Sequence, residues 1–167
     1  MQPAQPYGVA VRYLLLTALL LMASSAGLAQ SMTGKVLLVH DGDTLTVLDG
    51  QTRLKVRLTG IDAPELRQAF GPQSKESLED LCLARDATVK VVARDHRGGG
   101  SGLVKCDGVD ASAEQVKRGM AWVYKPHVAA TSPLYFLEDQ AQRSREGLWK
   151  EPSPLAPWLW RSSRHRR

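Results

Sequence analysis

The chain has 167 residues, of which 43% are hydrophobic and 23% are charged, and its formal net charge is +5. This length excludes a large membrane bundle and a two-domain enzyme, and the hydrophobic content with four Trp residues argues against a disordered chain. Residues 30–160 hold 17 Lys and Arg against 17 Asp and Glu, so any basic surface there must come from the arrangement of the residues.

The first 29 residues have the layout of a secretory signal peptide. Arg12 is their one charged residue, an apolar run of 11 residues extends from Tyr13 to Ala23, and small residues continue through Ala29. This run is shorter than the ~20 residues that span a bilayer, and Gly27-Leu28-Ala29 is a plausible cleavage site. We therefore predict an exported protein, periplasmic or secreted, with no membrane span after cleavage. An uncleaved amino-terminal anchor is the alternative.

Three consecutive strands are expected at the start of the mature chain. Residues 32–39 are mostly apolar or β-branched, residues 44–48 alternate, and Asp49-Gly50 is a strong hairpin turn. In residues 52–58, apolar side chains alternate with cationic ones and so occupy opposite faces of a strand. The first part of the domain is therefore predicted to be a three-stranded meander.

Helices and strands then alternate along the chain. Helices are predicted at 72–83, at 112–118 and from Ser132-Pro133 to Gly147, and strands at 87–93 and 103–106. Five short strands with about three helices indicate an α+β fold within residues 30–150. The arrangement that suits them is a small Greek-key β-barrel of the oligonucleotide-binding (OB) type.

Residues 151–167 are expected to form an extended strap and a basic tail. Three Pro in residues 152–157 disfavour a helix, and Trp158 and Trp160 are expected to dock back on the domain. Residues 161–167 carry four Arg and no acidic residue, so we expect this tail to lack a fixed structure and to add salt-sensitive affinity for nucleic acid. A solubilising end or a membrane-surface anchor is the alternative.

The chain has two cysteines, Cys82 and Cys106, both in the mature part. In an oxidising compartment an even pair indicates one disulfide, and two buried free thiols are the alternative. The Cys and His spacing of a zinc site is absent from the sequence.

Two segments concentrate the residue types that carry chemistry. The first is His40-Asp41-Gly42-Asp43-Thr44, at a junction between strands, and the second is residues 57–65, at the end of the next strand. The meander brings both together, so their carboxylates are expected to converge near Arg57; they belong to Asp41, Asp43, Asp62 and Glu65. Such a cluster repels itself unless a hard divalent cation such as Ca²⁺ binds, and an Arg beside it is typical of a phosphate site.

These segments resemble motifs of the thermonuclease family, the staphylococcal-nuclease-like nucleases built on an OB-fold. The matching pieces are Asp41-Gly42-Asp43-Thr44, residues 56–65, Gly119-Met120-Ala121-Trp122-Val123-Tyr124, Glu138-x-x-Ala141 and Gly147-Leu148-Trp149. They occur in family order and cover nearly the whole mature domain, and their combination is highly specific.

The resemblance implies one Ca²⁺ ion held by Asp43, by Asp62 and by the backbone carbonyl of Ala63, with Asp41 in or just outside the coordination sphere. Glu65 would be the general base that activates a water, and Arg57 would bind the scissile phosphate. Attack at phosphorus would leave 3′-phosphate ends on DNA or RNA. A carboxylate base, a Lewis-acid metal and a guanidinium are the groups that this hydrolysis needs.

The sequence departs from the family at its second phosphate-binding Arg. Where the family has Asp-Arg-Tyr-Gly-Arg, this chain has Asp95-His96-Arg97-Gly98-Gly99, so Gly99 occupies the Arg position. Three interpretations stay open. Arg97 substitutes after a shift of the glycine-rich loop, the enzyme works with one Arg at a rate lower by about 10²–10³, or catalysis is lost and a binding domain remains.

Tyr124 and Lys125 follow a strand-like segment and are candidates to line the nucleic-acid groove, because an aromatic ring beside a cation holds single strands without sequence preference. The sequence thus predicts a monomeric, exported, calcium-dependent nuclease of DNA and RNA, preferably single-stranded, with no stable protein partner. The alternative is a nucleic-acid-binding OB module without turnover. A third hypothesis is an interaction domain that docks on the cell envelope through its strap and tail.

Overall fold

The structure is a computed structural model that describes residues 31–96 and 98–164, so the predicted signal peptide, Arg97 and residues 165–167 lie outside the described residues. The strands are β1 (Ser31–Val39), β2 (Thr44–Asp49), β3 (Thr52–Leu58), β4 (Ile61–Asp62), β5 (Asp86–Arg94), β6 (Gly100–Cys106), β7 (Val109–Asp110) and β8 (Trp122–Val123). The helices are α2 (Gly71–Cys82), α3 (Ala111–Lys117), α4 (Leu134–Arg143) and α5 (Pro157–Arg164), with 3₁₀ turns η1 (Lys125–His127) and η2 (Gly147–Lys150).

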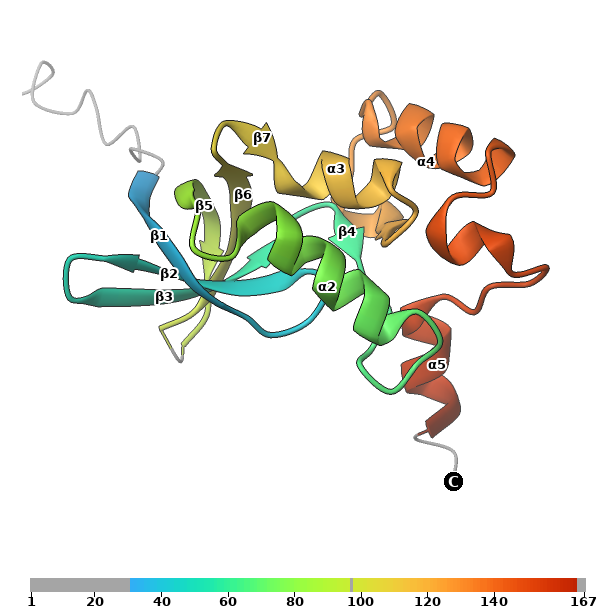
Figure 1. The fold of residues 1–167 in the computed structure, drawn as a ribbon, viewed down its shortest axis with the longest axis horizontal. Helices are drawn as coiled ribbons and strands as arrows, with labels where there is room; N and C mark the ends of the chain where they lie inside the picture. Colours follow the sequence, from blue (N-terminus) through green and yellow to red (C-terminus); the bar gives the residue numbers. More distant parts are fainter. Residues whose placement is uncertain (1–30, 97, 165–167) are drawn as a thin grey trace, which may run out of the picture.

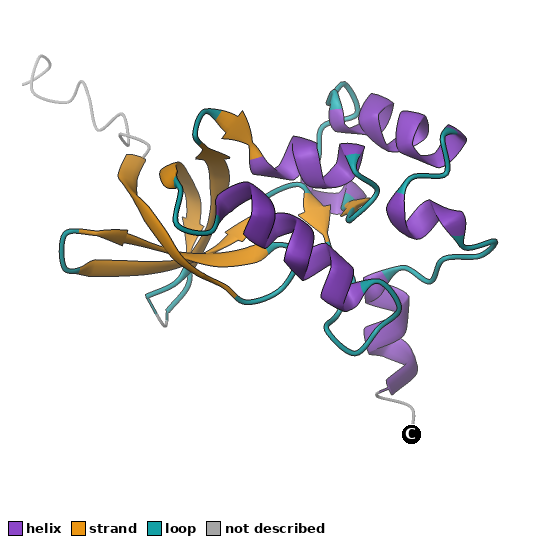
Figure 2. Cartoon of the chain, in the orientation of Figure 1, coloured by secondary structure: helices purple, strands orange, loops and turns teal. Residues whose placement is uncertain are grey.

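Five strands close into a barrel. They run in the order β3-β2-β1-β5-β6, and β6 pairs back on β3 in parallel. Figure 1 and Figure 2 show these strands gathered on one side of the molecule and the helices on the other. The predicted α+β fold with a five-stranded OB-type barrel is confirmed. The meander forms as expected, because the apolar side chains of β3 point into the core; they are Leu54, Val56 and Leu58.

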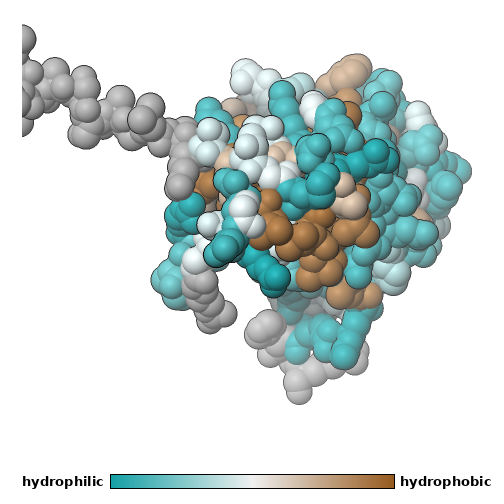
Figure 3. Space-filling view, turned by 60° about the vertical axis from the view of Figure 1, so that its left-hand side comes forward, coloured by the Kyte–Doolittle hydropathy of each residue, from teal (hydrophilic) through white to brown (hydrophobic). Residues whose placement is uncertain are grey.

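The barrel core is aliphatic and is covered at one end by α2. Leu78 of α2 is fully buried in this core together with Leu45 and Val89 from the strands. Cys82 at the end of α2 is bonded to Cys106 at the end of β6, with the two Cα atoms 5.3 Å apart. The bond therefore ties the covering helix to the barrel. On the surface, Figure 3 shows a face with an apolar patch near its centre among mostly hydrophilic residues.

The end of α4 differs from the prediction. The helix stops at Arg143 rather than at Gly147, and Arg145 and Gly147 adopt positive φ angles of 53° and 50°. Gly147 must be a glycine, because a Cβ there would lie 2.2 Å from the carbonyl oxygen of Gly119. This close approach lets the amide of Leu148 donate to the Gly119 carbonyl at 2.9 Å. A backbone hydrogen bond thus joins the motif that begins at Gly119 to the motif that begins at Gly147.

The structure corrects the expectation for the carboxyl-terminal segment. Residues 161–164 are part of helix α5 instead of an unstructured tail. Pro157 begins that helix, where its fixed φ is favourable and its missing N–H costs nothing. Trp158 docks on the domain as predicted, since it packs against the cluster of Trp122 and Leu148.

In Figure 1, α5 lies beside the loop that precedes α2. Among the described residues, no helix is long and apolar enough to cross a bilayer.

Candidate active site

The turn between β1 and β2 is built by buried contacts. The Gly42 carbonyl accepts a hydrogen bond from Gln115 Nε2 at 2.8 Å, and Gln115 itself is fully buried. A Cβ at Gly42 would lie 1.8 Å from Ser74 Oγ, so only glycine fits at this position. The Asp43 amide donates to Asp41 Oδ1 at 3.1 Å. Asp41 therefore shapes the turn that presents Asp43.

Asp43 and Asp62 converge on Arg57. Arg57 Nη2 donates to Asp43 Oδ2 at 2.9 Å and to Asp62 Oδ1 at 2.7 Å. The strand register explains the first contact, because Arg57 on β3 lies directly opposite Thr44 on β2. Both carboxylates are nearly inaccessible, with side-chain exposures of 2% and 3%, whereas the Arg57 side chain is 50% exposed. One buried carboxylate pair thus shares a guanidinium that reaches solvent.

One backbone amide and one hydroxyl also hold the Asp43 carboxylate in place. The Ala63 amide donates to Asp43 Oδ2 at 3.0 Å, and Thr44 Oγ1 donates to Asp43 Oδ1 at 2.8 Å. Burial raises the pKa of Asp43 to about 6, against the opposing effect of Arg57. Burial alone would lower the pKa of Arg57, but the carboxylates of Asp43 and Asp62 outweigh it and raise that pKa.

The raised pKa of Asp43 predicts a pH effect on stability. Because the folded pKa of about 6 lies above the ordinary 3.8, the contribution of this group is fully present below pH 3.8 and is lost as the pH rises through about 6. We expect Asp43→Asn to raise the free energy of unfolding of the metal-free protein at pH 7 and to flatten its pH dependence across that window. Urea unfolding at several pH values measures this. Asp80→Asn, at an exposed position on α2, is the control, and a pH profile like the unmodified one would contradict the prediction.

Glu65 forms an ion pair with Arg161, which the sequence analysis did not identify as a site residue. Arg161 of α5 donates from Nη1 to Glu65 Oε1 at 2.8 Å and from Nη2 to Asp62 Oδ2 at 2.7 Å. The hydrogen bond to Asp62 and, after it, the one to Glu65 raise the pKa of Arg161. Glu65 stays 43% exposed and Arg161 39% exposed. Pro157, with no later proline to stop a helix, is a sequence signal for α5, but it does not indicate that Arg161 contacts Asp62.

Arg161 separates two cavities. One, of about 270 Å³, is lined by Arg57, Asp62, Tyr124 and His127, and the other, of about 370 Å³, by Asp41, Glu65 and Trp160; Arg161 lines both. Tyr124 lies beside Arg57 in the smaller of these cavities, with its ring 5.0 Å from that of His127 and 5.9 Å from that of Trp158. Lys125 lies in η1 and does not line either cavity.

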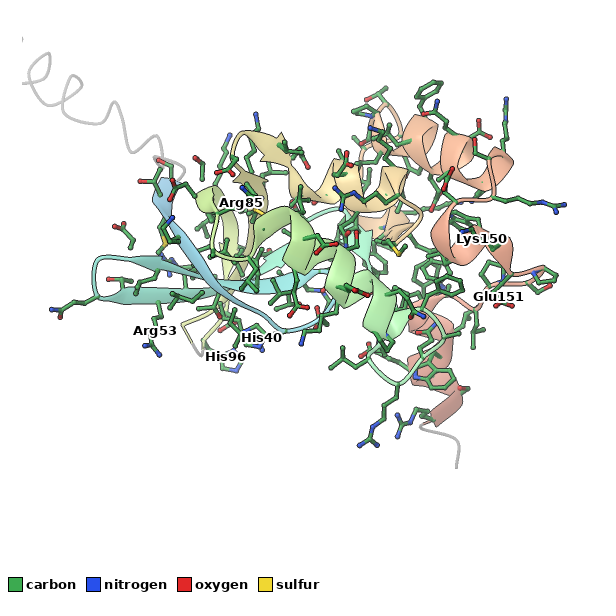
Figure 4. All side chains as sticks on the ribbon, in the orientation of Figure 1. His40, Arg53, Arg85, His96, Lys150 and Glu151 are labelled. Carbon is green, nitrogen blue, oxygen red and sulfur yellow. A yellow bond between two sulfur atoms is a disulfide. The ribbon has the colours of Figure 1, made fainter. Side chains whose placement is uncertain are left out.

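Gly99, at the position of the family's second Arg, does not line either of these cavities. Ser101 is the β6 residue that pairs with Arg57, and Gly99 lines a different cavity, with Leu37 and Leu38. A Cβ at Gly99 would lie 2.6 Å from Asp95 Oδ2 and 3.2 Å from a backbone oxygen of β3. Figure 4 shows His96, on the same loop, well separated from α5. The proposed substitute Arg97 lies outside the described residues.

The donor atoms suit a hard cation. Asp43 and Asp62 already bind one cationic nitrogen within 2.9 Å, and carboxylate oxygens are the ligands that Ca²⁺ prefers. The Ala63 amide contact places Ala63 beside this pair. Within the described part of the chain, no three His, Cys, Asp or Glu side chains lie close enough together to hold a metal without a backbone donor or water.

The chain is similar to known nucleases. The family model described as "Staphylococcal nuclease homologue" matches residues 55–151. An "Uncharacterized endonuclease" of Escherichia coli is 36% identical over 136 residues, which are 80% of this chain and 88% of that protein. Another of Haemophilus influenzae is 38% identical over 154 residues, 90% of this chain and 85% of the relative. "Micrococcal nuclease" of Shigella flexneri is 36% identical over 138 residues, covering 77% and 79%.

Proposed function

Since the chain belongs to the staphylococcal nuclease family, we propose that it is an exported, calcium-dependent nuclease that hydrolyses phosphodiester bonds of DNA and RNA. The observation that carries this proposal is that two partly exposed Arg side chains, Arg57 and Arg161, converge on the buried carboxylate of Asp62. Arg57 also pairs with the buried carboxylate of Asp43, and Arg161 with the accessible carboxylate of Glu65. Such a set offers a base, a cation site and phosphate ligands within one small area.

The roles follow from exposure and charge. Glu65 reaches solvent and takes the proton of the attacking water, whereas Asp43 and Asp62 are too enclosed to act on a water from bulk. Arg57 binds a non-bridging oxygen of the scissile phosphate and stabilises the charge that develops there. Asp43, Asp62 and the Ala63 carbonyl would hold Ca²⁺, which when bound supplies Lewis-acid stabilisation of the same phosphate.

A single strand is the substrate that the cavity beside Arg57 favours. Tyr124 lines this cavity, and an aromatic ring next to cationic groups binds an unpaired base by stacking. Lys125 adds a positive charge one residue away. The chain acts as a monomer on this substrate, with little sequence preference.

Export is supported by two independent features. The first 29 residues have the composition of a cleavable signal, and the bonded pair of Cys82 and Cys106 suits an oxidising compartment. The mature protein therefore works in the periplasm or outside the cell.

A binding module without turnover is the second candidate, and Gly99 is the observation that favours it. A calcium experiment separates the two. Residues 30–167 are incubated with a labelled single-stranded oligonucleotide, with Ca²⁺ or with a chelator, and binding is followed in parallel by fluorescence anisotropy.

We expect cleavage with Ca²⁺ and none with the chelator. We also expect the circular dichroism spectrum to be the same in both, because Arg57 and Arg161 compensate the carboxylates of the metal-free protein. Binding without cleavage under both conditions would favour the module.

A further inference from the structure

We infer that Arg161 is a second phosphate-binding residue of this nuclease, supplied by helix α5. The inference rests on the proposed function and assigns an additional residue to the same site. Among the described residues, Arg161 alone lines both of the cavities that flank Asp62 and Glu65. A phosphate that enters the site from either cavity meets this guanidinium.

The two Arg side chains face each other across a single oxygen atom. Asp62 Oδ1 accepts from Arg57 Nη2 at 2.7 Å and from Arg161 Nη1 at 3.2 Å. Two guanidinium groups at this spacing can each bind a different oxygen of one phosphate group. Because charge develops on both non-bridging oxygens during attack, a second guanidinium stabilises the transition state more than the ground state.

Helix α5 holds Arg161 firmly enough for this role. Ala156 and Pro157 are buried at its start, and Ala156 packs against Trp122 and Leu148. Gln68 Nε2 donates to the Leu155 carbonyl and fixes the segment that leads into the helix. The side chain is therefore ordered before a substrate binds, which lowers the entropic cost of binding.

The competing explanation is that Arg161 blocks the site, because its ion pair with Glu65 keeps that carboxylate from acting on a water. Arg57 argues against it, because Arg57 forms the same kind of ion pair with Asp43 and Asp62 and still exposes half of its side chain. Arg161 likewise keeps 39% of its side chain accessible. Pairing with these carboxylates is thus common to both Arg side chains and leaves both of them partly accessible. Gly99 offers no side chain, whereas α5 brings a cation to Asp62 and Glu65.

The test is the rate of Arg161→Gln and Arg161→Lys in residues 30–167 with Ca²⁺ and a labelled single-stranded oligonucleotide. We expect Arg161→Gln to lower kcat by about 10²-fold and Arg161→Lys to lie between it and the unmodified chain, since lysine keeps the charge but not the planar fork. Arg143→Gln removes an exposed, ion-paired Arg of α4 and is the matched control. Oligonucleotide affinity is measured by anisotropy with and without Arg161→Gln in a Glu65→Gln background, in which cleavage is slow. This comparison separates a loss of binding from a loss of rate.

The possible results lead to different conclusions. A rate of Arg161→Gln equal to or above that of an active unmodified chain would overturn this inference alone, and an increase would identify Arg161 as a block. If Arg161→Gln lost the circular dichroism spectrum of the folded protein, Arg161→Lys would be the deciding variant. Full activity of a folded Arg161→Lys would contradict a role for the guanidinium group. An unmodified chain without activity would overturn the proposed function, and this inference with it.

Discussion

Replacing Glu65 by Gln is expected to lower kcat by about 10²–10⁴, which is the range that a positioned general base contributes. Glutamine keeps the size of the side chain and a carbonyl oxygen that accepts from Arg161, so the site keeps its shape. It cannot take a proton from water. The measurement is the initial rate of oligonucleotide cleavage at saturating Ca²⁺, together with anisotropy, in which we expect little change of affinity.

Glu76→Gln is the control for this variant, because Glu76 is an exposed residue of α2 and the substitution removes the same charge. It is expected to cleave at the rate of the unmodified chain. If Glu65→Gln were as active as this control, Glu65 would not be the base, and another group would have to activate the water.

Replacing Arg57 by Ala has the second large effect. We expect the rate to fall by about 10²–10³, because one donor to the developing charge is lost. A further consequence appears without substrate. Asp43 loses the guanidinium that lowers its pKa, so its carboxylate is left buried with backbone and Thr44 partners only. The metal-free variant should therefore unfold at a lower urea concentration at pH 7, and Ca²⁺ should restore more stability to it than to the unmodified chain.

Arg53→Ala is the matched control for Arg57→Ala. Arg53 lies on the same face of β3, is exposed and is shown in Figure 4 far from α5. Its loss should leave both the rate and the calcium response unchanged. If Arg57→Ala had the same rate and calcium response as Arg53→Ala, Arg57 would not be a phosphate-binding residue.

The barrel was predictable because its signals are local. In β3 the alternation of apolar and cationic residues fixes which face is buried, and Asp49-Gly50 fixes the register with β2. That register alone sets Arg57 opposite Thr44 and hence beside Asp43. The short strands β4 and β7 could not be predicted, because two residues carry no periodicity.

The position of Arg161 was not predictable from the sequence. It contacts Asp62 across 99 residues of chain, and no local pattern encodes a contact of that kind. Residues 151–156 are free of helix, as their prolines favour, but the same prolines concealed that Pro157 begins one. The docking of Trp158, which was expected, brings that helix and Arg161 to the site.

The most direct test of a calcium-dependent nuclease activity is the mass of the products that the unmodified residues 30–167 form from a defined single-stranded oligonucleotide. With Ca²⁺ present we expect fragments that end in a 3′-phosphate, and with a chelator in its place only intact oligonucleotide. Intact oligonucleotide under both conditions, or the same fragments with the chelator, would contradict that activity.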